Sequence, residues 1–511
     1  MARKKPTSKL GAVALTPIGT SPVNATSLPH LPHALTIPEI LTLCLVNLPR
    51  KDLLNAALTC REWSIWSRDT VWRTVEVPFS VLLKRLDFLF EASDCYRFNG
   101  LDAEPSASIM SAEDWLHFLN HYTRKISRMY LDVGLSHVAL HLLEKLAETH
   151  GGGPLSPNLR SLRISLAPMW KSTIPTIALI SSLTSITNVT LKQPPGDHKL
   201  QVFSEKLATV APHIKRLSLV GETTSDTSSN TRHTLDFSLF QQLREIHASD
   251  ISLASWYTLD GDPTESVHLT GYCPDPPGES ERYKKVTLPA LHKLSITTTS
   301  LHPDLILHTT MPALRTLVIR PTLRPTTGGF EDMVSAISKR SSELEEVDVN
   351  LGHKTISNGT IEALASLQYL VVLRIQCLPI TNQTIENLAK SIPHLRVLSL
   401  VFDPESATAE RVTGAGLLVL LRHCKGLNEL EISVDLCDSP HKSPAPPFQP
   451  SRTMTRLTLR QPKLPRDVRR AARFLVTCYP DVSRFEVAKG TSPKQEDHLI
   501  KEFKRIQSSR K

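Results

Sequence analysis

Hydrophobic residues recur through most of the chain in one short pattern: an apolar residue, a second one three positions later and a third two positions after that. From Leu159 onward, successive copies begin 27, 28, 29, 48, 23, 30, 26, 25, 32, 27 and 28 residues apart. Their first positions are Leu159, Ile186, Ile214, Leu243, Leu291, Leu314, Leu344, Leu370, Leu395, Leu427, Met454 and Val482. Looser copies begin at Trp72 and Ile126. Matches in such a near-regular series do not arise by chance, so the sequence is built from internal repeats.

Each repeat combines a strand pattern with a helix pattern. The alternation in "LRSLRISL", residues 159–166, predicts a short strand with one buried face. Between strands the spacing often becomes helical, as in "ITNQTIENLAKSIPHL", where Ile380, Ile385 and Leu388 share one side. One strand and one helix cannot bury their own apolar residues, so we expect the units to stack into a continuous core with a parallel sheet.

This arrangement resembles the leucine-rich repeat, in the longer cysteine-containing form found in ligase adaptors and ribonuclease-inhibitor-like folds. The resemblance covers roughly residues 72 to 488. It implies an α/β solenoid with a curved parallel sheet inside and helices outside. With an N-terminal module added, the solenoid is expected to occupy residues 76–488.

Three segments interrupt the repeats. Residues 223–234 and 434–452 are polar or proline-rich and are predicted to be exposed loops. The 48-residue spacing after Leu243 holds either an insertion or one decayed repeat, and we favour an insertion near 255–289.

The segment "IPEILTLCLVNLPRKDLLNAALTCREW", residues 37–63, has a different character. Fifteen of its 27 residues are apolar, and they fall into two or three short helices separated near Pro49. A unit of about 40 residues cannot bury this much apolar surface by itself. Its surplus is therefore expected to face either the repeats or another protein.

The order Ile37-Pro38-Glu39-Ile40-Leu41, Leu48-Pro49, Asp52-Leu53-Leu54, Cys60-Arg61-x-Trp63 and Asp69-x-x-Trp72 resembles an F-box. Thr59 departs from the pattern, because a valine is more usual before the cysteine. The resemblance implies an all-helical module at residues 34–75 that docks onto the SKP-family adaptor of cullin–RING ubiquitin ligases. By the same resemblance the candidate interface residues are Pro38, Ile40, Leu41, Leu45, Leu48, Leu53, Leu54, Leu58, Cys60 and Trp63. The alternative is that this module only caps the end of the solenoid.

The formal net charge of +9 resides mostly in the tails. Residues 1–38 and 489–511 each carry +4, so the body is nearly neutral, which argues against a nucleic-acid groove. We expect disordered basic tails at 1–33 and 489–511, with a short amphipathic helix in "EDHLIKEFKRIQ".

The eight cysteines are scattered, without a Cys-x-x-Cys pair, and are expected to be reduced. There is no convincing signal peptide, and no apolar run reaches the roughly 20 residues of a membrane span. We therefore expect a cytoplasmic or nuclear protein, or one found in both compartments, with no membrane partner.

No motif in the chain indicates catalysis. We find no P-loop, no G-x-G-x-x-G and no nucleophile elbow, so no cofactor, metal or catalytic residue is predicted. The resemblance instead implies the substrate-recognition subunit of an SCF-type ubiquitin ligase. A leucine-rich-repeat interaction scaffold without ubiquitin transfer is the alternative. A GTPase activator would need an exposed catalytic arginine in a loop, and the sequence indicates none.

Residues between and just after the apolar strand positions are expected on the concave sheet face. In the N-terminal half they include the basic residues Arg128, Arg163, Lys192, Arg216, Lys293 and Arg320, with only Asp132 and Glu245 opposing them. One hypothesis is a basic lane that binds an acidic or phosphorylated segment of a protein substrate. The alternative is a solvated face with incidental charge.

Overall fold

The computed structural model describes residues 41–70 with gaps at 42–43, 46, 59–62 and 68–69, and a series of further ranges. These ranges are 126–132, 156–165, 185–192, 197–220, 235–249, 251–271, 284–298, 306–321, 330–350, 358–377, 380–402, 412–437, 449–488 and 493–510. The chain divides into two compact units, Met1–Trp72 and Arg73–Lys511. Among the residues described, no helix has the length and apolar character needed to cross a membrane.

The second unit contains one long parallel sheet. Its strands, in spatial order, are β1 (Arg128–Asp132), β2 (Ser161–Ser165), β3 (Asn188–Lys192), β4 (Arg216–Val220), β5 (Glu245–Ser249), β6 (Ser266–Gly271), β8 (Lys293–Thr298), β10 (Thr316–Pro321), β11 (Glu346–Asn350), β12 (Val372–Cys377), β13 (Val397–Phe402), β15 (Glu429–Asp435), β16 (Arg456–Lys463) and β17 (Arg484–Ala488). The short strand β14 (Val412–Thr413) pairs with β15. A separate two-stranded sheet joins β7 (Val286–Thr287) to β9 (Thr309–Thr310).

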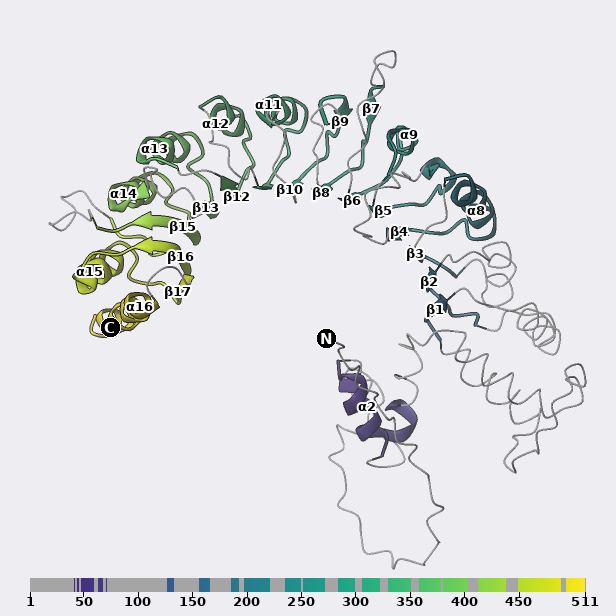
Figure 1. The fold of residues 1–511 in the computed structure, drawn as a ribbon, viewed down its shortest axis with the longest axis horizontal. Coiled ribbons are helices and arrows are strands. Elements are labelled where there is room, and N and C mark those ends of the chain that lie inside the picture. Colours follow the sequence, from purple (N-terminus) through teal and green to yellow (C-terminus); the bar gives the residue numbers. More distant parts are fainter. Residues whose placement is uncertain are drawn as a thin grey trace, which may run out of the picture. The chain divides into compact units, whose positions relative to one another are not determined.

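Helices connect many of these strands and lie on the outer side of the curved sheet (Figure 1). They are α8 (Asp197–Val210), α9 (Leu253–Tyr257), α11 (Phe330–Arg340), α12 (Asn358–Ala365), α13 (Asn382–Ser391), α14 (Gly414–His423) and α15 (Val468–Cys478), with the 3₁₀ helix η3 (Phe237–Leu239) before β5. Helix α16 (Pro493–Ser508) follows the last strand. The expected α/β solenoid, with its sheet inside and its helices outside, is confirmed.

The apolar pattern of the sequence explains the register of the sheet. Leu162 pairs with Val189, Val189 with Leu217, and Leu217 with Ile246, so equivalent repeat positions stand in line across the strands. These side chains are almost completely buried. The same alignment continues to β17, where Leu457 pairs with Phe485. One continuous core therefore runs through all of the described repeats.

The preference for an insertion near 255–289 is wrong. Strand β6 occupies a regular place in the sheet between β5 and β8. Its repeat has Thr264 at the first pattern position, and this side chain is fully buried. The Thr264 hydroxyl and amide donate hydrogen bonds of 2.7 and 3.0 Å to Asp262 Oδ1, which satisfies the polar group inside the core. The 48-residue spacing thus divides into 21 and 27 residues.

The other two expected loops lie mainly outside the described residues, which omit 221–234 and 438–448. The second one was placed too broadly, because Val434 and Asp435 still belong to β15. The N-terminal tail at 1–33 and the early repeat copy at Trp72 also lie outside the described residues.

The expected C-terminal tail is instead an ordered part of the solenoid. Helix α16 packs against α15 and β17 and buries Leu499 and Phe503. The ring of Phe503 stacks on Phe485 with centroids 4.1 Å apart. The Gln507 side-chain amide donates 2.8 Å hydrogen bonds to the carbonyl oxygens of Pro480 and Val482. Helix α16 therefore covers apolar residues of the last described repeat.

Two of the cysteines that the structure describes, Cys424 and Cys478, are buried. Among the described residues, Cys44, Cys424, Cys437 and Cys478 are free. Burial raises the pKa of the Cys424 thiol to about 12, so this side chain stays neutral and packs as a small apolar group.

Helix α16 provides a direct test of this fold. The substitution Phe503→Ala removes a fully buried ring and is expected to lower the free energy of unfolding by about 3–5 kcal/mol. Lys504→Ala, on the exposed side of the same helix, is expected to leave it nearly unchanged. Urea unfolding of the full chain, followed by circular dichroism, measures both. Equal stability of the two variants would show that α16 is a dispensable tail.

Candidate protein-binding surfaces

The first unit is held together by a small apolar core. Helix α2 (Arg50–Ala57) begins after Pro49, which has φ −63° and ψ 151° and leaves the chain extended before the first helical turn. The core contains Leu41, Leu45, Leu53 and Ala56, with Trp63 and Trp66 packed against it.

The structure divides the candidate interface residues of this unit into buried and exposed sets. Leu41, Leu45 and Leu53 are between 0 and 4% exposed, so in the free chain they hold the helices together and offer no surface to a partner. Leu48 and Leu58 are 36% and 86% exposed. Sequence reasoning missed Ile65, which is 50% exposed.

The other candidate interface residues of this unit are Trp63, Leu54, Pro38, Ile40 and Cys60. Trp63 is half-buried against the core. Leu54 lies in α2, but its side chain is not described. Pro38, Ile40 and Cys60 lie outside the described residues.

The second surface is the concave face of the sheet, where the strands line the inner side of the curve (Figure 1). In β5 the residues Glu245, His247 and Ser249 are half-buried, while Ile246 and Ala248 between them are buried. The same alternation in the other strands brings the basic candidates to this face. The side chains of Arg128, Arg163, Arg216, Lys293 and Arg320 are exposed, and that of Lys192 is half-buried.

The register places some of these cations directly beside carboxylates. Arg216 and Glu245 are partners on adjacent strands, and the Arg216 Nε donates a 2.6 Å hydrogen bond to Glu245. His247 Nε2 lies 2.6 Å from the other oxygen of Glu245. Burial opposes ionisation of Glu245, yet the hydrogen bonds from His247 and Arg216 hold its pKa below the ordinary value.

Next to this group, His247 and His268 have ring centroids 5.3 Å apart. Burial, followed by the charges of His247 and Lys293, lowers the pKa of His268. Lys293 is thus a cation close enough to an imidazole to lower its pKa.

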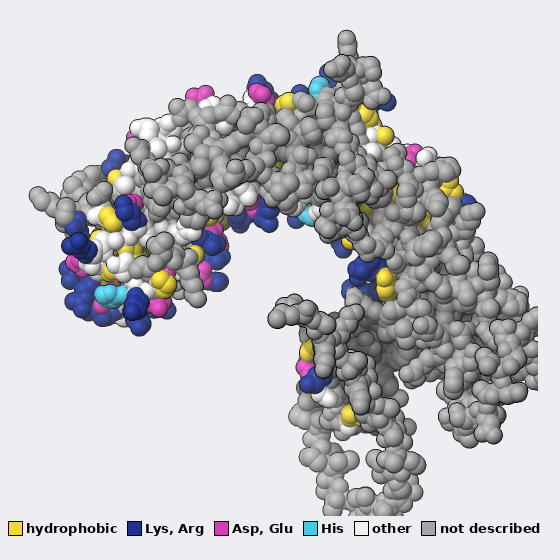
Figure 2. Space-filling view, in the orientation of Figure 1, with side chains coloured by type: hydrophobic (Ala, Val, Ile, Leu, Met, Phe, Trp, Pro, Cys, Tyr) yellow, Lys and Arg dark blue, Asp and Glu magenta, His cyan; other side chains and the backbone are white. Residues whose placement is uncertain are grey.

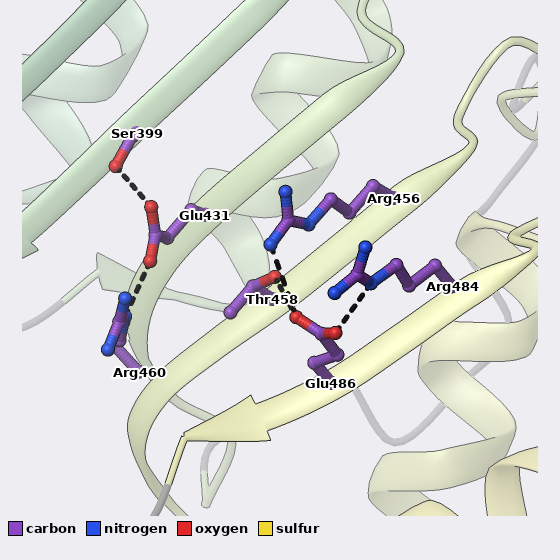
Figure 3. A network of polar contacts seen from close by, with 7 residues as sticks. All are labelled: Ser399, Glu431, Arg456, Thr458, Arg460, Arg484 and Glu486. Carbon is purple, nitrogen blue, oxygen red and sulfur yellow. Dashed lines mark hydrogen bonds and ion pairs between the residues drawn. The ribbon is translucent and has the colours of Figure 1, made fainter. Parts of the chain in front are cut away.

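Arginines further along the sheet are paired in the same way. Arg320 forms an ion pair with Asp348, and Arg374 with Glu346. Figure 3 shows the network at the far end, where Glu431 accepts hydrogen bonds from Ser399 at 2.7 Å and from Arg460 at 2.5 Å.

In the second half of that network, one carboxylate joins two arginines. Glu486 accepts from Arg484 at 2.5 Å and from Arg456 at 3.3 Å (Figure 3). The hydrogen bond from Arg484 is the main cause of a lowered pKa at Glu486. The Arg456–Glu486 contact links side chains 30 positions apart in the sequence on the adjacent strands β16 and β17, whereas Arg484 and Glu486 lie two positions apart on β17.

A different arrangement occurs on the first three strands. Tyr130 and Arg163 are register partners on β1 and β2, and the Arg163 guanidinium carbon lies 5.6 Å from the centre of the Tyr130 ring. Lys192 Nζ of β3 lies 5.7 Å from the same ring. Within the described ranges, neither cation forms an ion pair, and neither does Arg128 on the same face.

The hypothesis of a basic lane across the N-terminal half therefore needs correction. Arg216 and Arg320 are neutralised by Glu245 and Asp348, so the lane is not continuous. Among the basic candidates, Arg128, Arg163 and Lys192 on β1 to β3 and Lys293 on β8 form no ion pair within the described residues, and Arg163 and Lys192 lie beside Tyr130. Aligning the repeats would have indicated the Arg216–Glu245 pair, because both residues precede the second apolar position of their repeats.

A metal site is not found in the part of the chain that the structure describes, where no group of three potential ligands comes together. The two surfaces defined by these residues are suited to binding proteins: exposed leucine and isoleucine side chains on a small helical unit, and a long polar sheet face.

Comparison with known families identifies the first unit. Residues 35–73 match the F-box domain. The chain thus joins an F-box domain to a solenoid of leucine-rich repeats. None of the curated proteins compared with it matches the chain.

Two solved structures are similar to this chain at low identity. One is the leucine-rich repeat-containing protein LegL7 from Legionella pneumophila, with 11% identity over 73% of this chain and 97% of that chain and a TM-score of 0.29. The other is a protein from Bacteroides fragilis, with 13% identity over 70% of this chain and 84% of that chain and a TM-score of 0.30. The solenoid itself is established by the register of its own strands.

The burial difference within the F-box domain leads to a stability prediction. Leu53→Ala should destabilise the domain by about 2–5 kcal/mol because it removes a core side chain. Leu58→Ala should have little effect, because its side chain already faces water. Hydrogen exchange of the amides between residues 41 and 72, measured by mass spectrometry on the full chain, compares the two. Faster exchange in the Leu58 variant than in the Leu53 variant would contradict the assignment.

Proposed function

We propose that this chain is the substrate-recognition subunit of an SCF-type ubiquitin ligase. The F-box would dock onto an SKP-family adaptor and through it onto a cullin–RING assembly, while the solenoid binds a target protein. The observation that carries the proposal is the F-box match at residues 35–73, followed in the same chain by a solenoid with a long polar sheet face.

In this role the chain is a non-catalytic adaptor. Ubiquitin transfer requires a target lysine to meet a charged carrier protein, and holding both on one assembly raises their effective concentration. The chain then contributes to the rate through binding and orientation alone. The expected cytoplasmic or nuclear location is part of the same proposal.

The exposed apolar side chains of the F-box are the best candidates for the adaptor contact. Leu48, Leu58 and Ile65 expose apolar surface that a partner would remove from water. Burial of such surface stabilises a complex by roughly 25 cal/mol per Å² before the costs of association. The buried residues Leu41, Leu45 and Leu53 would support these side chains indirectly by fixing the helices.

For the target, the proposal assigns an acidic or phosphorylated segment to the cluster of Arg128, Arg163 and Lys192 around Tyr130. These cations lack the carboxylate partners that neutralise Arg216 and Arg320. An arginine fork can bind two oxygens of one anionic group, and a lysine adds a point charge beside it.

Adaptor binding is the first test. The full chain is expected to co-purify with an SKP-family adaptor at equal stoichiometry, and the double substitution Leu58→Asp/Ile65→Asp should lower recovery about tenfold or more. Charges introduced at these exposed positions would be buried without a partner in the complex.

The matched control is Val220→Asp/Tyr369→Asp, which changes two exposed apolar side chains of the solenoid. It should leave adaptor recovery unchanged. A folded chain that ignores the adaptor would make the F-box unit a cap of the solenoid. A chain that binds the adaptor but not cullin would be an interaction scaffold without ubiquitin transfer.

The target surface is tested separately with immobilised peptide libraries that contain a fixed phosphoserine, glutamate or serine. Arg163→Glu/Lys192→Glu is expected to reduce retention on the phosphoserine library about tenfold or more. Arg216→Gln/Arg320→Gln should have a smaller effect, because these arginines are already paired.

The control for net charge is Lys206→Glu/Lys215→Glu, at exposed positions on α8 and the turn before β4. Equal losses in all three double variants would reduce the cluster to incidental surface charge. Circular dichroism spectra and melting curves confirm that each variant is folded.

A further inference from the structure

The C-terminal end of the solenoid carries a second basic surface, on the outer side of α15 and α16. Arg469 and Arg473 are exposed along α15, and Arg466 is exposed just before it. Lys501, Lys504 and Arg505 are exposed along α16. Figure 2 shows lysine and arginine side chains gathered over this end of the solenoid.

A single carboxylate holds arginines of the two helices side by side. Arg505 donates hydrogen bonds of 3.1 and 2.8 Å to Glu502 Oε2, and Arg469 Nε lies 3.6 Å from Glu502 Oε1. The Glu502 side chain is only 10% exposed, whereas those of Arg469 and Arg505 are 60% and 61% exposed. Hydrogen bonding to Arg505 is the main cause of a lowered pKa at Glu502, so this carboxylate stays ionised.

This geometry fixes the Arg505 guanidinium before any partner arrives and places the Arg469 guanidinium beside the same carboxylate, at a distance longer than a hydrogen bond. Each arginine has five N–H donors, and Glu502 accepts hydrogen bonds from two of those of Arg505 and from none of those of Arg469, so donors of both arginines remain available. Fixing such side chains in advance reduces the conformational entropy that binding would otherwise cost. The surface is therefore preorganised for anionic groups.

The surrounding acidic residues do not neutralise the patch. Asp467 caps α15, where its side chain accepts a hydrogen bond from the Arg469 amide at 3.1 Å. Glu496 is buried on α16, and Asp497 is exposed on that helix. Arg473 and Lys501 form no ion pair with any residue in the described ranges.

The pattern of the patch distinguishes between classes of anionic partner. A membrane anchor would need exposed large apolar side chains, and within the described residues neither helix has one. Asp467 and Asp497 stand among the cations, so this face is less favourable for a uniform polyanion such as duplex DNA. The axes of two packed helices lie about 8–10 Å apart, and along each helix the charges recur every three or four positions.

We propose that the α15–α16 face is a docking site for an acidic protein segment, with Glu or Asp side chains that reach Arg469, Arg473, Lys501 and Arg505. Carboxylates match the planar arginine fork and the spacing of charges along helices. The site is separate from the concave cluster at β1 to β3 and from the F-box, so it goes beyond the proposed function.

The experiment measures fluorescence anisotropy of a labelled oligoglutamate peptide with the full chain at about 150 mM salt. Arg473→Glu/Lys501→Glu is the test variant, because these residues lie outside the Glu502 contacts and their change leaves that carboxylate paired. We expect the dissociation constant to rise about tenfold or more in this variant. It should stay within about twofold of the unmodified chain in Lys206→Glu/Lys215→Glu, which has the same change of net charge.

Two further measurements decide between binding surfaces and partner classes. Arg163→Glu/Lys192→Glu should leave most peptide binding intact; loss of binding in that variant alone would overturn the proposal, because the peptide would then occupy the concave face. Duplex DNA and vesicles of phosphatidylcholine and phosphatidylserine, at about three to one, serve as competing probes. One of these probes could bind more tightly than the peptide and lose its binding only in the Arg473→Glu/Lys501→Glu variant. The partner would then be nucleic acid or a membrane and not a protein.

Preorganisation is tested with Arg469→Lys/Arg505→Lys, which keeps both charges but removes the forked donors. A severalfold weaker affinity with an unchanged melting temperature supports the role of the clamped guanidiniums. Unchanged affinity would show that only net charge matters at this face and would overturn the assigned geometry.

Discussion

Parallel pairing of successive repeats in one register is the constraint on which the rest of this structure depends. At the start of each strand, a carbonyl of the preceding repeat accepts two consecutive amides, as Thr187 does from Lys215 and Arg216. This contact fixes which side chains enter the core. A shift by one residue would turn Leu217 to solvent and Arg216 into the interior. Burying that charge and exposing that apolar side chain would make the shifted register unstable.

The same register determines the electrostatics of the concave face. Residues that are distant in sequence become neighbours on adjacent strands, and Arg216–Glu245, Arg374–Glu346 and Arg460–Glu431 are ion pairs for this reason. Exposed pairs of this kind contribute little to stability. Their larger effect is to remove free charge from most of the sheet face, which leaves the cluster around Tyr130 as a distinct basic site.

Much of the fold could be predicted from the sequence, because leucine positions that recur with a near-constant spacing require a stacked sheet. The repeat that contains β6 was not predicted, because its first pattern position is Thr264 and not an apolar residue. The buried Thr264 hydroxyl donates a hydrogen bond to Asp262. The amphipathic helix predicted in residues 496–507 is present as part of α16, but the prediction of a disordered tail failed there, because the apolar stripe with Leu499 and Phe503 packs on the last described repeat. The F-box motif located the domain, but a motif cannot separate core leucines from surface leucines. Leu53 and Leu58 lie five positions apart, so the helical repeat directs one side chain into the core and the other to solvent.

The unequal pairing along the concave face has a kinetic consequence. Free charges at β1 to β3 attract an anionic partner over a distance of about one Debye length, so they accelerate encounter and lose this effect as ionic strength rises. At β10 to β17 a partner must break existing ion pairs before its own charged groups can bind these arginines. Contacts formed there therefore act mainly on the dissociation rate of the complex. The two rates would then respond differently to salt. The association rate would report on β1 to β3, and the dissociation rate on β10 to β17.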